Sequence, residues 1–194
     1  MFTNPRTLKR MMKEAFKAEN LVVGSRDGMI YLQGVYWKLL CKKEYIPKTI
    51  LAELIELTGE IPETGECYCA GKDGNQVQFN DMKVDIPETA KLIGVTDFIL
   101  RGKTGVLQRI LQFDSGKIYL INDKFIDMMR GKHYDIEKGE TEPAGPYCDP
   151  AKGIFWRNEV MTFSTLFRVD DEHYSTLTSM ETLELSYREE PDDV

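Results

Sequence analysis

The chain has 194 residues, of which 42% are hydrophobic and 29% are charged, and its formal net charge is −7 at pH 7. This composition is ordinary for a soluble globular protein, and the length is sufficient for a sizeable core. The sequence contains no apolar run of about 18–20 residues, as a membrane helix requires, and no signal peptide is recognisable at its start. These features predict a cytoplasmic protein that does not enter a membrane.

The charges are distributed unevenly along the chain. Residues 1–19 carry five basic and two acidic side chains, whereas residues 170–194 carry one basic and nine acidic side chains. A protein that wraps bare nucleic acid needs a basic surface, so direct DNA binding is the less favoured function. The acidic segment at the end of the sequence is typical of a solvated chain end.

A first helix is expected over residues 5–18, with Asn4 as its cap and Pro5 in its first turn. Its apolar side chains recur at helical spacing and form one stripe, which consists of Leu8, Met11, Met12, Ala15 and Phe16. The opposite face is basic and consists of Arg6, Lys9, Arg10, Lys13 and Lys17. The amphipathic pattern favours a docked helix whose charges face water over a nucleic-acid-binding helix.

The rest of the first half predicts hairpins and a second helix. Strands are expected at 21–24, 29–32 and 35–41, with the Asp27–Gly28 pair as a hairpin turn. A helix follows over 47–58, ended by Gly59, and a short hairpin is expected over 66–80. The polar segment 81–89 predicts a boundary between residues 1–85 and 86–194, unless the two halves form one continuous domain.

The clearest local signal in the second half is the segment 105–131. Alternating apolar residues predict two strands around a turn at Asp114–Gly116, followed by a helix over 123–130 that Asn122 caps. A strand is also expected within 92–100, a hairpin over 153–169 and a strand over 182–187. Residues 132–152 are rich in glycine and proline and predict a long loop.

Together, these elements predict an α+β fold in which two or three helices cover antiparallel sheets. Two strands followed by a polar turn and a helix occur twice, around 42–59 and 121–131, which indicates a duplicated β-β-α unit. This order of elements resembles that of DNA sliding clamps, and Lys117–Met129 and the hairpin from Phe155 to Val169 carry the resemblance. It implies an accessory role in DNA replication or recombination, with the basic first helix as the DNA contact.

The sequence contains no recognisable catalytic or metal-binding motif. A Gly-x-Ser-x-Gly elbow, a phosphate-binding loop and a calcium loop are all absent. Cys67 and Cys69 lie on one strand face, but a zinc site normally has a second closely spaced pair of ligands. We therefore predict free cysteines, no metal, no cofactor and no catalytic residues. A cryptic enzyme stays open as an alternative.

The sequence as a whole is similar in texture to accessory proteins of phages and mobile elements. It predicts a non-enzymatic binding protein, such as an anti-CRISPR-like inhibitor of host nucleic-acid machinery. The expected partner is a protein, for example a basic nucleic-acid-binding one. The anchors expected for this partner are aromatic and acidic residues, namely Tyr147, Phe155, Trp156, Asp170, Asp171 and Glu172. The alternative is the clamp-like factor that binds DNA through the basic helix.

Overall fold

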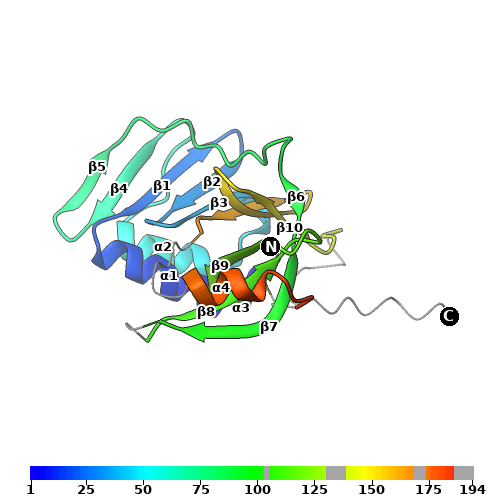
Figure 1. The fold of residues 1–194 in the computed structure, drawn as a ribbon. Coiled ribbons are helices and arrows are strands. Elements are labelled where there is room, and N and C mark those ends of the chain that lie inside the picture. Colours follow the sequence, from blue (N-terminus) through cyan, green and yellow to red (C-terminus); the bar gives the residue numbers. More distant parts are fainter. Residues whose placement is uncertain (103–104, 130–138, 168–173, 186–194) are drawn as a thin grey trace.

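The fold is described here from a computed structural model, which covers residues 1–102, 105–129, 139–167 and 174–185. Helices and antiparallel sheets make up this part of the chain, which confirms the predicted α+β class (Figure 1). One sheet has nine strands and the other has three. No helix among these residues is long and apolar enough to cross a membrane.

The nine-stranded sheet has the strand order β5-β4-β1-β2-β3-β12-β11-β10-β6. Its strands are β1 (Leu21–Arg26), β2 (Met29–Gln33), β3 (Trp37–Lys42), β4 (Cys67–Gly71), β5 (Gly74–Val77), β6 (Lys91–Leu92), β10 (Ala144–Asp149), β11 (Gly153–Arg157) and β12 (Met161–Thr165). Every neighbouring pair is antiparallel. The pairing of β3 with β12 joins strands from the two predicted halves.

The three-stranded sheet has the order β7-β8-β9, with β7 at Gly94–Arg101, β8 at Leu107–Gln112 and β9 at Ile118–Asn122. The hairpin between β8 and β9 confirms the strongest local prediction, and Gly116 in its turn has the positive φ that favours glycine. The helix α4 (Tyr174–Met180) lies against β9. Leu177 and Met180 pack there on Ile118 and Leu120.

Three helices lie between the two sheets: α1 (Pro5–Lys17), α2 (Lys48–Thr58) and α3 (Asp123–Met129) (Figure 1). The short 3-10 helix η1 (Lys43–Tyr45) precedes α2. α1 contacts β1, β4, α2 and α3, and α3 contacts β8 and β9. One core therefore extends from the large sheet through these helices to the small sheet.

The predicted caps explain where the helices begin and end. The Asn4 side chain accepts hydrogen bonds from the N–H groups of Arg6 and Thr7, and Asn122 accepts one from Lys124. Gly59 ends α2 in the left-handed conformation. The stripe of α1 is buried as predicted, apart from Phe16, which is only partly buried.

Three predictions for the second half are wrong in part. The segment read as a loop contains β10, which pairs with β6 and, across a bulge, with β11. Cross-strand pairing there overrides the glycine and proline content on which the loop prediction rested. The expected single strand at 92–100 is divided between β6 and β7, which belong to different sheets. Residues 182–185 form no strand, because the chain turns there after α4.

Candidate functional site

The helices cover one face of the nine-stranded sheet, and the other face holds the candidate site. A single cross-strand row crosses this open face, because directly opposed residues of neighbouring strands point to the same side. The row consists of Gln33, Lys38, Ser164, Phe155 and Tyr147. Residues 80–86 cross the same face, where Met82 and Val84 pack on Tyr31.

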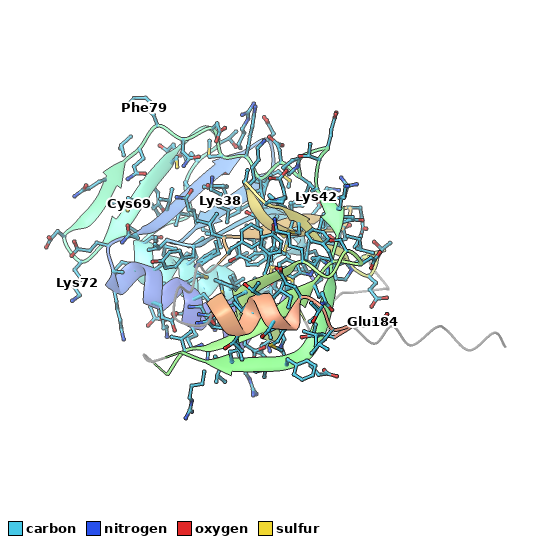
Figure 2. The ribbon with its side chains drawn as sticks, in the orientation of Figure 1. Lys38, Lys42, Cys69, Lys72, Phe79 and Glu184 are labelled. Atoms are coloured by element: carbon cyan, nitrogen blue, oxygen red, sulfur yellow. The ribbon has the colours of Figure 1, made fainter. Side chains whose placement is uncertain are left out.

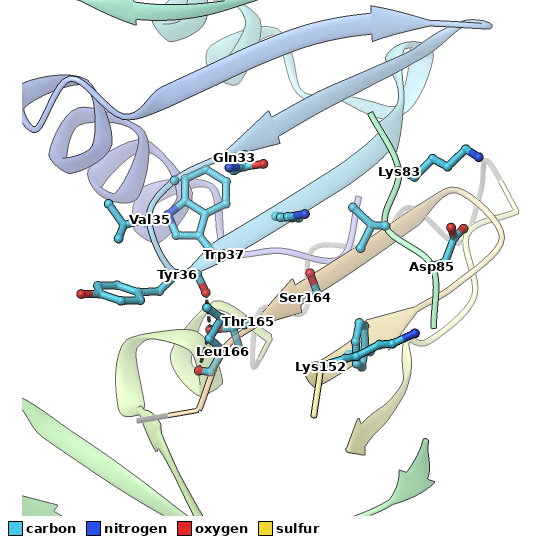
Figure 3. A pocket seen from close by; sticks show the side chains of 14 residues that line it. Gln33, Val35, Tyr36, Trp37, Lys83, Asp85, Lys152, Ser164, Thr165 and Leu166 are labelled. Carbon is cyan, nitrogen blue, oxygen red and sulfur yellow. Dashed lines mark hydrogen bonds between the residues drawn. The ribbon is translucent and has the colours of Figure 1, made fainter. Parts of the chain in front are cut away.

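A pocket of about 310 Å³ lies between this crossing segment and the row (Figure 3). Phe155 and Ser164 line it from the sheet. Val35, Tyr36 and Leu166 line one end, whereas Lys83, Asp85 and Lys152 line the other. The pocket is therefore apolar at one end and charged at the other.

The apolar end is built by the turn between β2 and β3. The N–H of Gly34 donates to the carbonyl of Trp37 over 3.0 Å. A Cβ atom at Gly34 would lie 2.3 Å from the indole nitrogen of Trp37, so only glycine fits. The carbonyl of Tyr36 accepts from the N–H of Leu166 at 3.0 Å and from the hydroxyl of Thr165 at 2.9 Å. These bonds fix the backbone and leave 62% of Tyr36 exposed.

At the charged end, the turn between β10 and β11 provides Lys152, whereas the crossing segment provides Lys83 and Asp85. The Asp149 carboxylate accepts a hydrogen bond from the hydroxyl of Thr89. It also accepts from the N–H of Ala151 at 2.9 Å and of Lys152 at 3.0 Å. These hydrogen bonds, that of Thr89 foremost, lower the pKa of Asp149. Asp149 therefore holds the backbone of Lys152 in place through its ionised form.

Tyr31 lies buried beneath the crossing segment and contacts Gln33 and Val84, two residues that line the pocket. Its burial raises the pKa of Tyr31 to about 12, so the side chain is a neutral phenol at pH 7. The phenol donates a hydrogen bond to the Gln33 side chain. Gln33 is thus oriented by a buried group.

The structure brings together only some of the predicted partner-binding residues. Tyr147 and Phe155 are opposed on the open face, and Phe155 is a buried lining residue of the pocket. Trp156 points to the helix side, where it is buried with its ring centroid 5.8 Å from that of Phe163. It belongs to the core, so the expected role as a surface anchor does not fit its position. Asp170, Asp171 and Glu172 lie outside the described residues.

The basic residues predicted as the alternative, nucleic-acid-binding face lie on α1, which packs on the covered side of the sheet. The ammonium groups of Lys9 and Lys13 lie 3.7 Å and 3.0 Å from the carboxylate of Glu53 on α2. The Nε atom of Arg10 lies 3.9 Å from Oε1 of Glu14. This face is therefore partly neutralised, which reduces its attraction for phosphates. Arg6 and Lys17 are exposed.

The cysteines and the other potential metal ligands of the described residues do not form a metal site. All four cysteines are free, and Cys67 and Cys69 share a strand face, where burial raises the pKa of both thiols. No group of three or more potential metal ligands occurs in the part of the chain that the structure describes. His133 and His173 lie outside that part. What the pocket provides is shape, an aromatic surface and charge.

Sequence reasoning missed the residues that shape the pocket. The sequence predicts Tyr36 within a strand, and Lys83 and Asp85 within a polar boundary segment. The available signal was Gly34, since glycine favours a turn, and the exposed residues Val35 and Tyr36 follow it directly. The pocket itself follows from the pairing of β3 with β12, which no local pattern predicts.

The sequence matches no protein-family model, and neither the curated proteins nor the solved structures contain a detectably similar chain. The geometry of the site is therefore the basis for a functional assignment.

Proposed function

We propose that this protein is a non-enzymatic binding protein that associates stoichiometrically with another protein through the pocket on the open sheet face. The observation that carries the proposal is the exposed group of Val35, Tyr36 and Leu166 beside the pocket. Exposed apolar side chains that gather around a concavity are typical of interaction sites, and tyrosine is enriched among the residues that dominate binding energies.

The charges support two contributions to the interaction, a long-range attraction by the net charge and short-range contacts by lysines of the pocket. The net charge of −7 favours a basic partner, such as a nucleic-acid-binding protein, through long-range attraction. Lys38 and Lys83 form no ion pair within the described residues, so they can contact an acidic or hydrogen-bonding group of the partner at short range. An inhibitor of host nucleic-acid machinery, carried by a phage or mobile element, is the biological role that we propose.

Tyr36→Ala should weaken capture of the partner by about tenfold or more, as expected for a binding hot spot. The measurement is quantitative pull-down from host lysate with the parent protein and the variant as baits. Ile55→Ala is the matched control, because Ile55 is an exposed apolar residue on α2, on the covered side of the sheet. Any protein that the resin captures without bait is background.

Lys38→Glu extends this test to a charged residue that lines the pocket from the sheet. It should reduce capture, because a carboxylate at this position repels the acidic group that we propose Lys38 contacts. The loss should become smaller as salt screens these exposed charges. If Tyr36→Ala and Lys38→Glu both retain every captured protein at the parent level, the pocket is not the binding site and the proposal is wrong.

A further inference from the structure

The strand β5 forms one edge of the nine-stranded sheet, and only β4 pairs with it in the described structure. Figure 1 shows β5 at the outer end of the sheet, and Figure 2 shows Phe79 projecting from the segment that follows it. Val77 is 84% exposed and Phe79 is fully exposed. Two large apolar side chains therefore lie beside an open strand edge.

The hydrogen-bonding direction of this edge follows from its pairing with β4. The N–H of Gln78 donates to the carbonyl of Cys67 over 2.9 Å, so the pairing continues one residue past β5. In an antiparallel pair, alternate residues direct their backbone groups to opposite sides. The backbone groups of Gly74, Gln76 and Gln78 thus point toward β4, whereas those of Asn75, Val77 and Phe79 point outward.

The edge lacks the features that normally prevent strand pairing. Proteins protect exposed edges with charged residues, proline or bulges. Residues 74–80, Gly-Asn-Gln-Val-Gln-Phe-Asn, contain neither a charge nor a proline in a chain with 29% charged residues. Their pairing with β4 shows no register shift. This segment is therefore competent to accept another strand.

We propose that β5 pairs with β5 of a second copy of this chain, in an antiparallel arrangement about a two-fold axis. The outward backbone groups allow a register in which Val77 of each copy lies opposite Phe79 of the other. Gln78 then lies on the axis, facing Gln78 of the other copy. In this register, apolar side chains of the two copies lie opposite each other, and no two like charges face each other within residues 75–80. A two-fold interface requires such self-complementarity, because the same surface occurs on both copies.

The choice of a second copy rests on this self-complementarity. A two-fold axis brings each residue near it close to its own counterpart, so a charged edge would repel itself, whereas the edge at 74–80 is neutral. Isologous pairing at β5 also gives a closed dimer. The opposite edge of the sheet is formed by β6, which has only two residues. A strand of a different protein is the competing occupant that the experiment distinguishes.

Sedimentation velocity of the parent protein over a range of concentrations tests the pairing. The contact is short compared with stable interfaces of about 1,200–2,000 Å², so we expect a monomer–dimer equilibrium that shifts with concentration. Gln78→Lys and Gln78→Glu should each be monomeric, because each substitution places the same charge on residue 78 of both copies, and these two charges face each other across the axis. An equimolar mixture of the two variants should dimerise again, because opposite charges then face each other.

Leu92→Lys is the matched control, because Leu92 is an exposed apolar residue on the opposite edge strand and its change should leave the dimer intact. Hydrogen exchange gives a second readout. The amides of Asn75, Val77 and Phe79 should gain protection as concentration rises, while that of Gln78 is already protected by β4. A parent that is monomeric at all concentrations, or a dimer that neither Gln78 variant changes, overturns the proposal. Binding of a different protein by a monomer through Val77 would assign the edge to that partner.

Discussion

Phe163→Ala should lower the free energy of unfolding by about 3–5 kcal/mol. The side chain of Phe163 is fully buried on β12. Its ring centroid lies 5.8 Å from that of Trp156 and 6.0 Å from that of Phe125 on α3. The substitution removes the ring at the point where the large sheet meets this helix, and the rigid backbone on both sides cannot close the cavity. Urea unfolding followed by circular dichroism measures the loss.

Phe79→Ala is the control for this substitution, because it removes the same side chain from a fully exposed position. At low protein concentration it should change the free energy of unfolding by no more than about 0.5 kcal/mol. Equal effects of the two substitutions would show that Phe163 does not join the sheet to α3 as described.

Asp123→Ala should destabilise the protein by roughly 3 kcal/mol, because it leaves a buried guanidinium group without its partner. The Nε and Nη2 atoms of Arg109 each lie 2.8 Å from Oδ1 of Asp123, and Nη1 donates to the carbonyl of Thr96 over 3.2 Å. Arg109 is buried, whereas Asp123 is partly exposed. We therefore expect the lower end of the range of about 3–5 kcal/mol that applies to broken buried pairs.

The double variant Arg109→Met/Asp123→Ala tests this explanation. It should recover much of the stability, because no unpaired charge remains buried. Arg10→Ala removes one member of an exposed pair on α1 and should cost less than about 0.5 kcal/mol. If Asp123→Ala is no more harmful than Arg10→Ala, the Arg109 pair does not secure the start of α3.

The elements that depend on local chemistry were predictable from the sequence. Asn4 and Pro5 mark the beginning of α1, Asp27–Gly28 marks the first hairpin, and Gly116 marks the hairpin between β8 and β9. In each case a side-chain cap or a glycine with positive φ determines the conformation within a few residues. Alternation of apolar residues then places the strands that adjoin these turns.

The elements that depend on distant pairing were not predictable. β10 contains Gly145 and Pro146 and forms a strand because β6 and β11 pair with it on both sides. The division of residues 91–101 between two sheets follows from the same kind of long-range pairing. The recurring β-β-α order is present as β2-β3-α2, with η1 before α2, and as β8-β9-α3, in different sheets. The similarity to sliding clamps stays a prediction.

The candidate site could be predicted only in part. The aromatic character of Tyr147 and Phe155, in or beside a glycine- and proline-rich segment, predicts them as anchors, and they are opposed on the open face. The same pattern predicts Trp156 as an anchor, but neighbouring residues of a strand point to opposite faces, so Trp156 points away from the face that Phe155 occupies. The sequence does not indicate which face the helices cover. Nor does it indicate that residues 80–86 return across the sheet to complete the pocket.

The most direct test of stoichiometric binding is a titration of the captured partner's own activity with this protein, at partner concentrations well above the dissociation constant. We expect the activity to change linearly up to a fixed molar ratio and then to stay constant, with the same break point at every incubation time. Tyr36→Ala should shift the curve to higher concentrations. If a substoichiometric amount of this protein progressively changed the activity of the whole partner population with time, the protein would act by turnover. That result would contradict the account and favour a cryptic enzyme.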